Sequence, residues 1–392
     1  MIAGPAVIKT DLPLKLFARG KVRDTYELDD DRLLMVATDR ISAFDHILPN
    51  GIPDRGKVLT QLSIFWFSQT DYFRENHLES GQVPDLPAEL KDKRGELAGR
   101  FMIVRKAKRI DFECVVRGYL AGSAWKEYEE SKSLAGEKMP PGLRQSEKLA
   151  TPIFSPATKA ETGHDENVTF AQMKKEIGAE LADKMREASL ELYKFAADLS
   201  ARRGLILADT KFEFGTIGDD LILIDEALTP DSSRLWESST YVVGTSPESY
   251  DKQFVRDWLT RSGWDKESEP PELPADIVAQ TRERYLTAYH RLVGKPLFPP
   301  KARNERVITK VIVTPKPVVN EPQGITVKQG LASLGFREVS DVRVGKYIEV
   351  RLDAANEHEA RQRVEAMCRQ LLANHVIEDF HFEIEVDGHK NT

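Results

Sequence analysis

Residues 208–226 read ADTKFEFGTIGDDLILIDE, which predicts two antiparallel strands joined by a short turn. Because side chains alternate along a strand, Asp209, Lys211 and Glu213 are expected to share one face of the first strand. The threonine and the two phenylalanines between them then form the opposite face, which can pack on a core. Three charged side chains in a row on one face of a mid-chain strand indicate a ligand or an ion that neutralises them.

The second strand of this pair returns through a turn near Gly218-Asp219 and ends at Asp225. If the hairpin is centred on residue 219, Glu213 lies opposite Asp225. Two facing carboxylates repel each other unless a cation bridges them. Magnesium suits that position, since proteins commonly hold it with one or two carboxylates and substrate phosphates. We therefore predict a magnesium site on Glu213 and Asp225; the alternative interpretation is an exposed charged hairpin.

The segment RGKVRD, residues 19–24, is a candidate phosphate-binding turn. Gly20 allows the backbone N–H groups to be exposed, and Lys21 and Arg23 add positive charge, a combination suited to nucleotide phosphates. The alternative is a solvated basic turn.

The segment ECVVRGYLAGSAWK, residues 113–126, is expected to end a strand and begin a helix. Gly118 and Gly122 permit close backbone approach, and Ser123 can cap the helix. A helix N-terminus with Arg117 nearby would form an anion site, although strand-to-helix turns without a ligand are common.

Two polar segments remain. Residues 155–167, which precede a predicted helix, contain Lys159 and His164; a substrate-contacting loop and a solvated loop are both consistent with them. No second histidine lies nearby in the sequence, which disfavours a metal site at His164. Residues 38–45, with Ser42 and Asp45, form a similar polar segment after a strand.

Composition limits the class of protein. The chain has 392 residues, 41% of them hydrophobic, a net charge of −7 and two cysteines. The negative charge argues against a general nucleic-acid binder, and no apolar run approaches the roughly 20 residues that cross a bilayer. Two cysteines assigned to different domains give no disulfide framework. With no secretory signal apparent, we expect a cytoplasmic protein.

The pattern along the chain predicts two domains separated by a proline-rich linker at residues 294–305. In the first domain, residues 1–293, a long helix is expected from about Thr169, capped with Gln172, to Arg202. Strand-like segments accompany it at residues 32–38, 100–116, 205–213 and 221–225.

The second domain, residues 306–387, is followed by a short tail, residues 388–392. Its elements are expected in the order βαββαβ, a ferredoxin-like arrangement. The expected segments are strands at 307–313, 339–344, 347–352 and 380–386, and helices at 325–334 and 357–372.

Taken together, the motifs of the first domain resemble the phosphoribosylaminoimidazole-succinocarboxamide (SAICAR) synthase family. The matching stretches are GKVRD (20–24), TDRISAFD (38–45), ECVVRGYLAGSAWKEY (113–128), SPATKAETGHDEN (155–167), LILADTKFEFG (205–215) and DEALTPDSSRLW (225–236). The resemblance implies an α+β fold with two lobes, similar to the ATP-grasp enzymes, at about residues 1–105 and 106–293. ATP and Mg²⁺ are then the expected cofactors.

By the same resemblance, the candidate residues divide into four groups. Lys211 and Asp209 are the catalytic candidates; Gly20, Lys21 and Arg23 match the phosphate loop; Glu213 and Asp225 match the magnesium acids; and the substrate-binding candidates are Ser42, Asp45, Arg117, Ser123, Lys159, His164, Asp231 and Arg234. The implied reaction ligates L-aspartate to carboxyaminoimidazole ribonucleotide through an acyl phosphate. The alternatives are a small-molecule kinase of related fold and a scaffold with an inactive ligase.

The second domain resembles PurS, the small subunit of phosphoribosylformylglycinamidine synthase. The matching stretches are EPQG (321–324), VSDVRVGKY (339–347), LLAN (371–374) and VIED (376–379). The resemblance implies an assembly role without chemistry of its own. The expected partners are the large and glutaminase subunits of that synthase and further copies of this chain.

Overall fold

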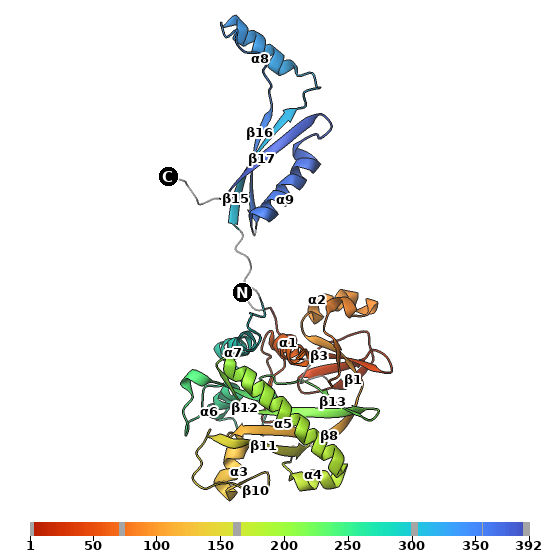
Figure 1. Ribbon diagram of the computed structural model, residues 1–392, viewed down its shortest axis with the longest axis vertical. Helices are drawn as coiled ribbons and strands as arrows, with labels where there is room; N and C mark the ends of the chain where they lie inside the picture. Colours follow the sequence, from red (N-terminus) through yellow and green to blue (C-terminus); the bar gives the residue numbers. More distant parts are fainter. Residues whose placement is uncertain (1–3, 70–74, 160–165, 299–304, 355, 387–392) are drawn as a thin grey trace. The chain divides into compact units, whose positions relative to one another are not determined.

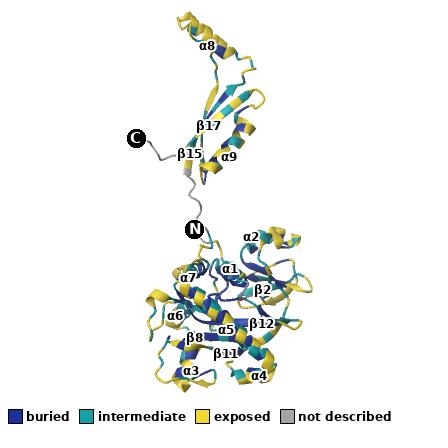
Figure 2. Cartoon of the chain, in the orientation of Figure 1, coloured by how far each residue is buried: buried dark blue, intermediate teal, exposed yellow. Residues whose placement is uncertain are grey.

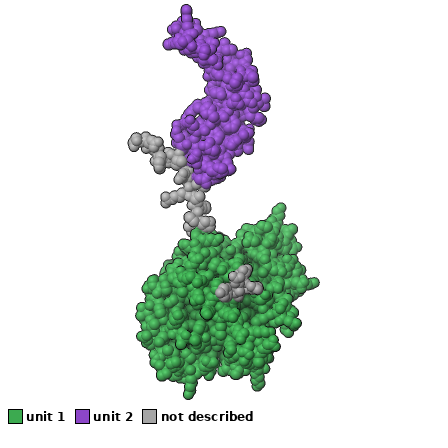
Figure 3. Space-filling view, in the orientation of Figure 1, with its two compact units in different colours: residues 1–298 green, residues 299–392 purple. Residues whose placement is uncertain are grey.

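The computed structural model describes residues 4–69, 75–159, 166–298, 305–354 and 356–386. The chain divides into two compact units, residues 1–298 and 299–392 (Figure 3). Among the described helices, none combines the length and the apolar character needed to span a membrane. The two units are described separately below.

The first unit begins with a five-stranded antiparallel sheet (Figure 1). In sheet order its strands are β1 (Leu16–Arg19), β2 (Arg23–Glu27), β3 (Arg32–Ala37), β7 (Phe101–Arg105) and β6 (Leu78–Ser80). Between β3 and the helix that follows lies a small hairpin of β4 (Ser42–Ala43) and β5 (His46–Ile47).

Both faces of this first sheet are buried, as alternating side chains of β3 show. Leu33 belongs to a core cluster shared with helix α1 (Arg55–Phe67), which lies against β3 and β7. Leu34 belongs to a second cluster with Leu90 and Leu97. Those two leucines come from the short helices that cover the other face, η1 (Val83–Asp85), η2 (Ala88–Lys93) and α2 (Arg94–Leu97).

The second sheet of this unit has the order β11-β8-β12-β13, with β14 also paired to β12. Its strands are β8 (Lys108–Tyr119), β11 (Lys148–Thr158), β12 (Leu205–Ile217), β13 (Asp220–Ile224) and β14 (Ser233–Glu237). The other elements are α3 (Ser123–Ser131), β9 (Ser133–Leu134), β10 (Glu137–Lys138), α4 (Phe170–Ile177), α5 (Ala179–Arg202), η3 (Ser238–Thr240), α6 (Gln253–Arg261) and α7 (Ala275–Val293).

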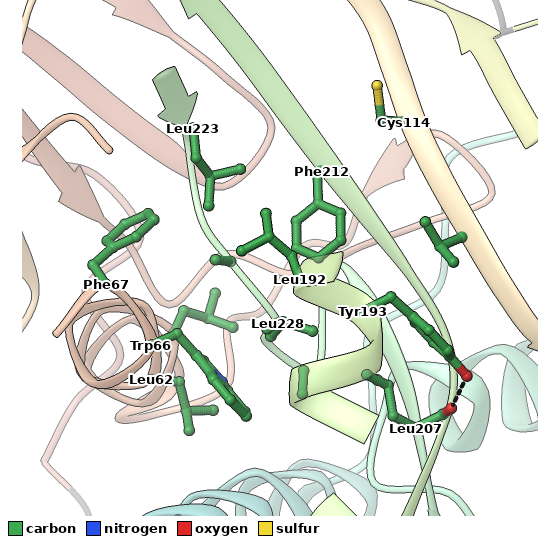
Figure 4. Close-up of a cluster of buried hydrophobic side chains, with 14 of the residues drawn as sticks. Leu62, Trp66, Phe67, Cys114, Leu192, Tyr193, Leu207, Phe212, Leu223 and Leu228 are labelled. Atoms are coloured by element: carbon green, nitrogen blue, oxygen red, sulfur yellow. Dashed lines mark hydrogen bonds between the residues drawn. The ribbon is translucent and has the colours of Figure 1, made fainter. Parts of the chain in front are cut away.

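One hydrophobic cluster joins the two sheets. Figure 4 shows Trp66 of α1, Leu192 and Tyr193 of α5, and Phe212 of β12 in this cluster. The Tyr193 hydroxyl donates a hydrogen bond to the carbonyl oxygen of Leu207 at 2.7 Å. Because one packed core includes elements from both sheets, the sheets have a fixed relation within the first unit.

Four sequence expectations for this unit are tested by the helices and strands observed. The strand pair β12 and β13 is confirmed, and so is the capping box of Thr169 with Gln172. The strand expected at 100–116 is two strands, β7 and β8, and the chain passes from the first sheet to the second between them. The single long helix is wrong, because Gly178, with φ of +89°, ends α4 and begins α5.

The second unit is a three-stranded antiparallel sheet with β15 (Glu305–Pro315) in the centre, flanked by β16 (Lys346–Ala354) and β17 (Glu378–Val386). Its helices are α8 (Pro322–Ser333) and α9 (Glu357–Met367), and a π-helical turn, Cys368–Leu372, extends α9. Val311, Val364 and Cys368 are among the residues of its core. Helix α8 is exposed along most of its length (Figure 2).

The α+β class is confirmed, but the βαββαβ order is wrong in one element. Residues 339–344, which the structure describes, form no strand, so the observed order is βαβαβ. The central strand β15 pairs with β16 and β17 and ends at Pro315. Because β15 and β16 are antiparallel, segment 339–344, which precedes β16, could pair only with a strand that continues β15 beyond Pro315. No such strand is present among the described residues. Alternating valines therefore give an extended segment without a strand partner.

Candidate active site

A cavity of about 1000 Å³ lies between the two sheets of the first unit. Ten sequence candidates line it: Gly20, Lys21, Arg23, Ser42, Asp45, Lys159, Lys211, Glu213, Asp225 and Asp231. They come from the first sheet and its hairpin, from the end of β11, and from β12 and the segment after β13. Folding therefore gathers into one site side chains that are up to about two hundred residues apart in the sequence.

One part of this cavity is apolar. Phe17, Leu33, Met35 and Val104 line it with the small side chains of Ala18 and Ala107. Lys106 lies over the Phe17 ring, with its ammonium group 5.4 Å from the ring centroid. An apolar patch with a few polar groups at its margin is the usual lining of a site for a flat organic group such as a nucleobase.

The other part of the cavity contains interleaved acids and bases. Lys211 on β12 contacts Glu113 on β8 and lies 3.4 Å from Glu213. Lys159 also contacts Glu213. Burial alone would lower the pKa of Lys211, but Glu213 and Glu113 outweigh it, so the pKa lies above its ordinary value. Lys211 is therefore a fixed positive charge at neutral pH.

The predicted pairing of Glu213 with Asp225 is wrong by one residue. Glu213 lies opposite Ile224, and Asp225 follows the end of β13 with φ of +65°. The side chain of Asp225 nevertheless reaches the cavity, where it binds Arg23 at 2.5 Å. Both acids therefore border the same space, although they do not face each other across the ladder.

Neighbouring cationic side chains offset the repulsion between the carboxylates of Glu213 and Asp225. Burial would raise the pKa of Asp225, but Arg23, Lys159 and Lys211 outweigh it and hold the pKa below its usual value. Burial would likewise lower the pKa of Arg23, and Asp225 and Glu226 reverse that. Both groups are charged at neutral pH.

A smaller pocket of about 90 Å³ adjoins the large cavity, and Asp231 and Lys252 line both. The guanidinium of Arg234 binds Asp209 there. Arg117 lies 3.6 Å from the same carboxylate, and its side chain donates to the Ser123 hydroxyl at 3.3 Å. Asp209 is thus bound by two arginines, which leaves a net positive charge beside this pocket.

The glycine at the start of α3 makes that arrangement sterically allowed. Gly122 is the N-cap of the helix, with φ of +57°, and a Cβ at this position would lie 2.2 Å from the guanidinium of Arg234. The expectation that Ser123 caps the helix is wrong, because the structure shows no side-chain cap there. Ser123 is instead the first helical residue and accepts a hydrogen bond from Arg117.

Lys21, Asp45 and Asp231 also form ion pairs. Lys21 binds Asp45 at 2.5 Å, so the phosphate turn and the segment 38–45 meet at the cavity. Asp231 is buried and is bound by Arg55 and Lys252. His164 lies outside the described residues.

Sequence reasoning missed several residues of the site: His77, Glu113, Glu226 and Arg256 each line one of the two pockets, and Lys252 lines both. Glu226 could have been found, since it follows Asp225 directly in the sequence. The guanidinium of Arg23 lies 3.1 Å from the carboxylate of Glu226. Burial raises the pKa of Glu226. Burial lowers the pKa of Lys252 against the opposing effect of Asp231. Neither Lys252 nor His77 stands in a recognisable motif, so only the fold shows their place.

The cavity suits a magnesium ion bound together with phosphates. Among the described residues, no group of three or more His, Cys, Asp or Glu side chains is arranged to hold a metal ion. Magnesium does not need such a group, because it usually keeps several waters and takes one or two carboxylates plus substrate phosphates. Glu213 and Asp225 are the carboxylates that would hold the ion, and the cationic side chains of Lys21, Arg23 and Lys211 line the same cavity.

Comparison with known proteins agrees with this geometry. The profile of the SAICAR synthetase family matches residues 16–271, and that of PurS, phosphoribosylformylglycinamidine (FGAM) synthase, matches residues 308–386. The phosphoribosylaminoimidazole-succinocarboxamide synthase of Geobacter metallireducens is 52% identical over 291 residues, which is 74% of this chain and 98% of that protein. The same enzyme of Maridesulfovibrio salexigens is 48% identical over 74% of this chain and 98% of its own.

Two solved structures show the same fold in the first unit. SAICAR synthase from Saccharomyces cerevisiae, complexed with SAICAR, is 44% identical, with a TM-score of 0.69 over 74% of this chain and 99% of that chain. A type-2 SAICAR synthetase in complex with ADP is 25% identical, with a TM-score of 0.53 over 71% and 98%.

The fold and the site of the first unit are those of a carbon–nitrogen ligase. The chain belongs to the SAICAR synthetase family of purine biosynthesis, and its second unit contains a PurS domain.

Proposed function

We propose that the first unit joins L-aspartate to 5-amino-1-(5-phosphoribosyl)imidazole-4-carboxylate and converts ATP to ADP and phosphate. The observation that carries this proposal is one cavity bordered by the phosphate turn and the two acids, with a cationic pocket beside it. The relatives solved with SAICAR and with ADP support the two ligand classes. A kinase on the same site would form ADP without aspartate, so the aspartate requirement of ADP release tests the proposal.

The chemistry requires activation of a carboxylate, because its oxygen is a poor leaving group. An oxygen of the imidazole carboxylate attacks the γ-phosphorus of ATP, and the bond from that phosphorus to the β–γ bridging oxygen breaks. This gives an acyl phosphate and ADP. The deprotonated amine of aspartate then attacks the acyl carbon, and phosphate leaves. The protein contributes mainly positioning and electrostatic stabilisation.

The residues that line the large cavity are proposed to have different roles in binding and catalysis. Lys21 and Arg23 bind the phosphates of ATP, and Lys211 adds a fixed charge where the transferred group passes. Glu213 and Asp225 would hold a magnesium ion, which would supply positive charge to offset the negative charge that develops during phosphoryl transfer. Ser42, Asp45 and Lys159 border the same space and contact the substrates.

The adjoining pocket is proposed to hold an anionic group of the ribonucleotide. Arg234, Arg117 and Ser123 supply the donors, and Asp209 fixes both guanidinium groups. Among the described residues, Asp209 borders only the smaller pocket, so we now assign it to positioning the arginines. Asp231 has a similar role, because its carboxylate is engaged by Arg55 and Lys252.

Gly20→Ala is expected to weaken ATP binding about tenfold without lowering stability. A Cβ on Gly20 would meet only the carbonyl oxygen of Arg23, at 3.6 Å, so the protein itself tolerates a methyl group there. The methyl group would instead stand where phosphates approach the exposed turn. Calorimetric titration with ATP and thermal unfolding measure the two effects. Gly95→Ala, which meets no atom within 4 Å, is the matched control; wild-type affinity in the Gly20 variant would contradict this role.

The second unit is proposed to act as the PurS subunit of FGAM synthase and to bind its large and glutaminase subunits. Its described surface carries exposed apolar side chains, including Val318 (91% exposed), Leu334 (77%), Leu371 (84%) and Val376 (71%). Exposed apolar side chains that gather in one contiguous patch are typical of interaction surfaces. Self-association stays a prediction of the resemblance. A pull-down of the purified subunits by the full chain tests the proposal, and their absence from the retained fraction would contradict it.

The domain boundaries are also proposals. We place the ligase domain at residues 1–293, with lobes at about 1–105 and 106–293, the linker at 294–305, the PurS domain at 306–387 and a tail at 388–392.

A further inference from the structure

Asp225 adopts a left-handed backbone conformation, which costs an aspartate more than a glycine and which tertiary contacts can stabilise. Its φ is +65°, in the left-handed region that favours glycine. The residue stands directly after β13, so its peptide group is no longer part of the ladder with β12. The direction of its carboxylate into the cavity therefore depends on contacts outside the sheet.

Among the described residues, two contacts from the N-terminal part of the first unit hold Asp225, in addition to the local hydrogen bond between its carboxylate and the backbone N–H of Glu226. Arg23 of β2 binds the carboxylate at 2.5 Å. His77 binds the backbone: its ring Nε2 lies 3.1 Å from the carbonyl oxygen of Asp225. A carbonyl oxygen only accepts hydrogen bonds, so the Nε2 atom carries the proton and donates.

His77 is itself rigidly placed against β13. Its backbone N–H donates to the carbonyl oxygen of Leu223 at 3.0 Å, and the N–H of Leu223 donates to the carbonyl oxygen of Glu75 at 2.8 Å. The ring is 3% exposed and meets the Phe67 ring edge-on, with the centroids 5.5 Å apart. The segment before β6 thus extends the second sheet by a short pairing, and its histidine reaches the peptide two residues further on.

We propose that His77 is a positioning residue for the metal and phosphate site, acting through the backbone of Asp225. The hydrogen bond from His77 fixes the peptide group of Asp225 in its left-handed conformation. That conformation directs the Asp225 carboxylate toward Glu213 and Arg23. The same hydrogen bond also links the segment before β6 to the acid that follows β13. The inference rests on the proposed function, in which Asp225 contributes to binding the nucleotide with its metal.

The test compares ADP binding to the full chain with and without magnesium chloride by calorimetric titration. His77→Leu removes the hydrogen-bond donor and puts an apolar side chain in its place. This variant is expected to bind ADP about tenfold more weakly in the presence of magnesium, and within about twofold of wild type in its absence. His77→Gln retains a donor and is expected to recover most of the loss. The exposed His290→Leu on α7 is the matched control and should change neither value.

Asp225→Asn separates this inference from the function on which it rests. If this variant shows wild-type magnesium dependence, the proposed metal role of Asp225 fails, and the role of His77 fails with it. If Asp225→Asn loses that dependence while His77→Leu keeps it, only the positioning role is overturned. Equal weakening of both binding values by His77→Leu and by His77→Gln would show a merely structural role. Thermal unfolding of each variant accompanies the titrations, and the glutamine variant decides if the leucine variant does not fold.

Discussion

Glu213→Gln and Asp225→Asn are each expected to lower turnover about 100- to 1000-fold, because the metal supplies several kcal/mol of charge stabilisation in phosphoryl transfer. The fold should survive both changes. Lys159 and Lys211, which would lose a partner in the Glu213 variant, are partly exposed, so their charges remain solvated. Steady-state kinetics with magnesium varied, together with circular dichroism, measure the two effects.

The control for these variants is Asp219→Asn, which makes the same change of charge at the exposed turn of the same hairpin. It should keep wild-type turnover. Activity within about threefold of wild type in both acid variants would contradict the metal assignment, because loss of a metal ligand should lower turnover far more than threefold.

Arg234→Met is expected to raise the KM of the ribonucleotide about 100-fold, as the loss of a buried charge partner typically does. The KM of ATP should change by no more than about threefold, because the arginine lines the smaller pocket and not the large cavity. Asp209 keeps Arg117 as a partner, and the buried Asp251 keeps the positive charge of Arg256, so neither carboxylate is left isolated in the variant. Substrate-dependence curves for each substrate in turn separate the two values.

Arg234→Lys should fall between the wild type and the methionine variant, because lysine keeps the charge but lacks the planar fork of arginine. Arg261→Met, an exposed change on α6, serves as the control. An equal rise in both KM values would contradict the division of the site into two pockets.

The hairpin shows how far the sequence alone could specify this site. Alternation along residues 209–213 correctly placed the charged side chains, because the strand is long and its period is fixed. The register depends on the turn: the observed pairing of Ile217 with Asp220 centres the hairpin between residues 218 and 219, whereas the prediction centred it on residue 219. Gly218, with φ of +61°, permits that turn. One residue of difference moved Asp225 out of the ladder.

The contacts of Asp225 could not be predicted from local pattern at all. Arg23 is 202 residues away in the sequence, and His77 is 148 residues away. No propensity or motif specifies such pairs, because they arise from packing of the two sheets around a shared core. The resemblance to a family brought Arg23 and Asp225 into one list of candidates, but the fold alone reveals that they bind each other.

In the second unit, the missing strand has a comparable cause. Alternating valines in residues 339–344 satisfy the local pattern of a strand, yet a strand also needs a neighbouring chain to accept its hydrogen bonds. The central strand ends at Pro315, a residue without a backbone N–H, so it does not extend far enough to form hydrogen bonds with residues 339–344. The local pattern was correct, and the tertiary partner was absent from the described residues.

The proposed ligase activity is tested most directly by ADP release from Mg-ATP and carboxyaminoimidazole ribonucleotide by the purified full chain, with and without aspartate. We expect sustained ADP release only when both the ribonucleotide and aspartate are present, with SAICAR formed in equal amount. ADP release that proceeds without aspartate, or no release from folded protein under any condition, would contradict it.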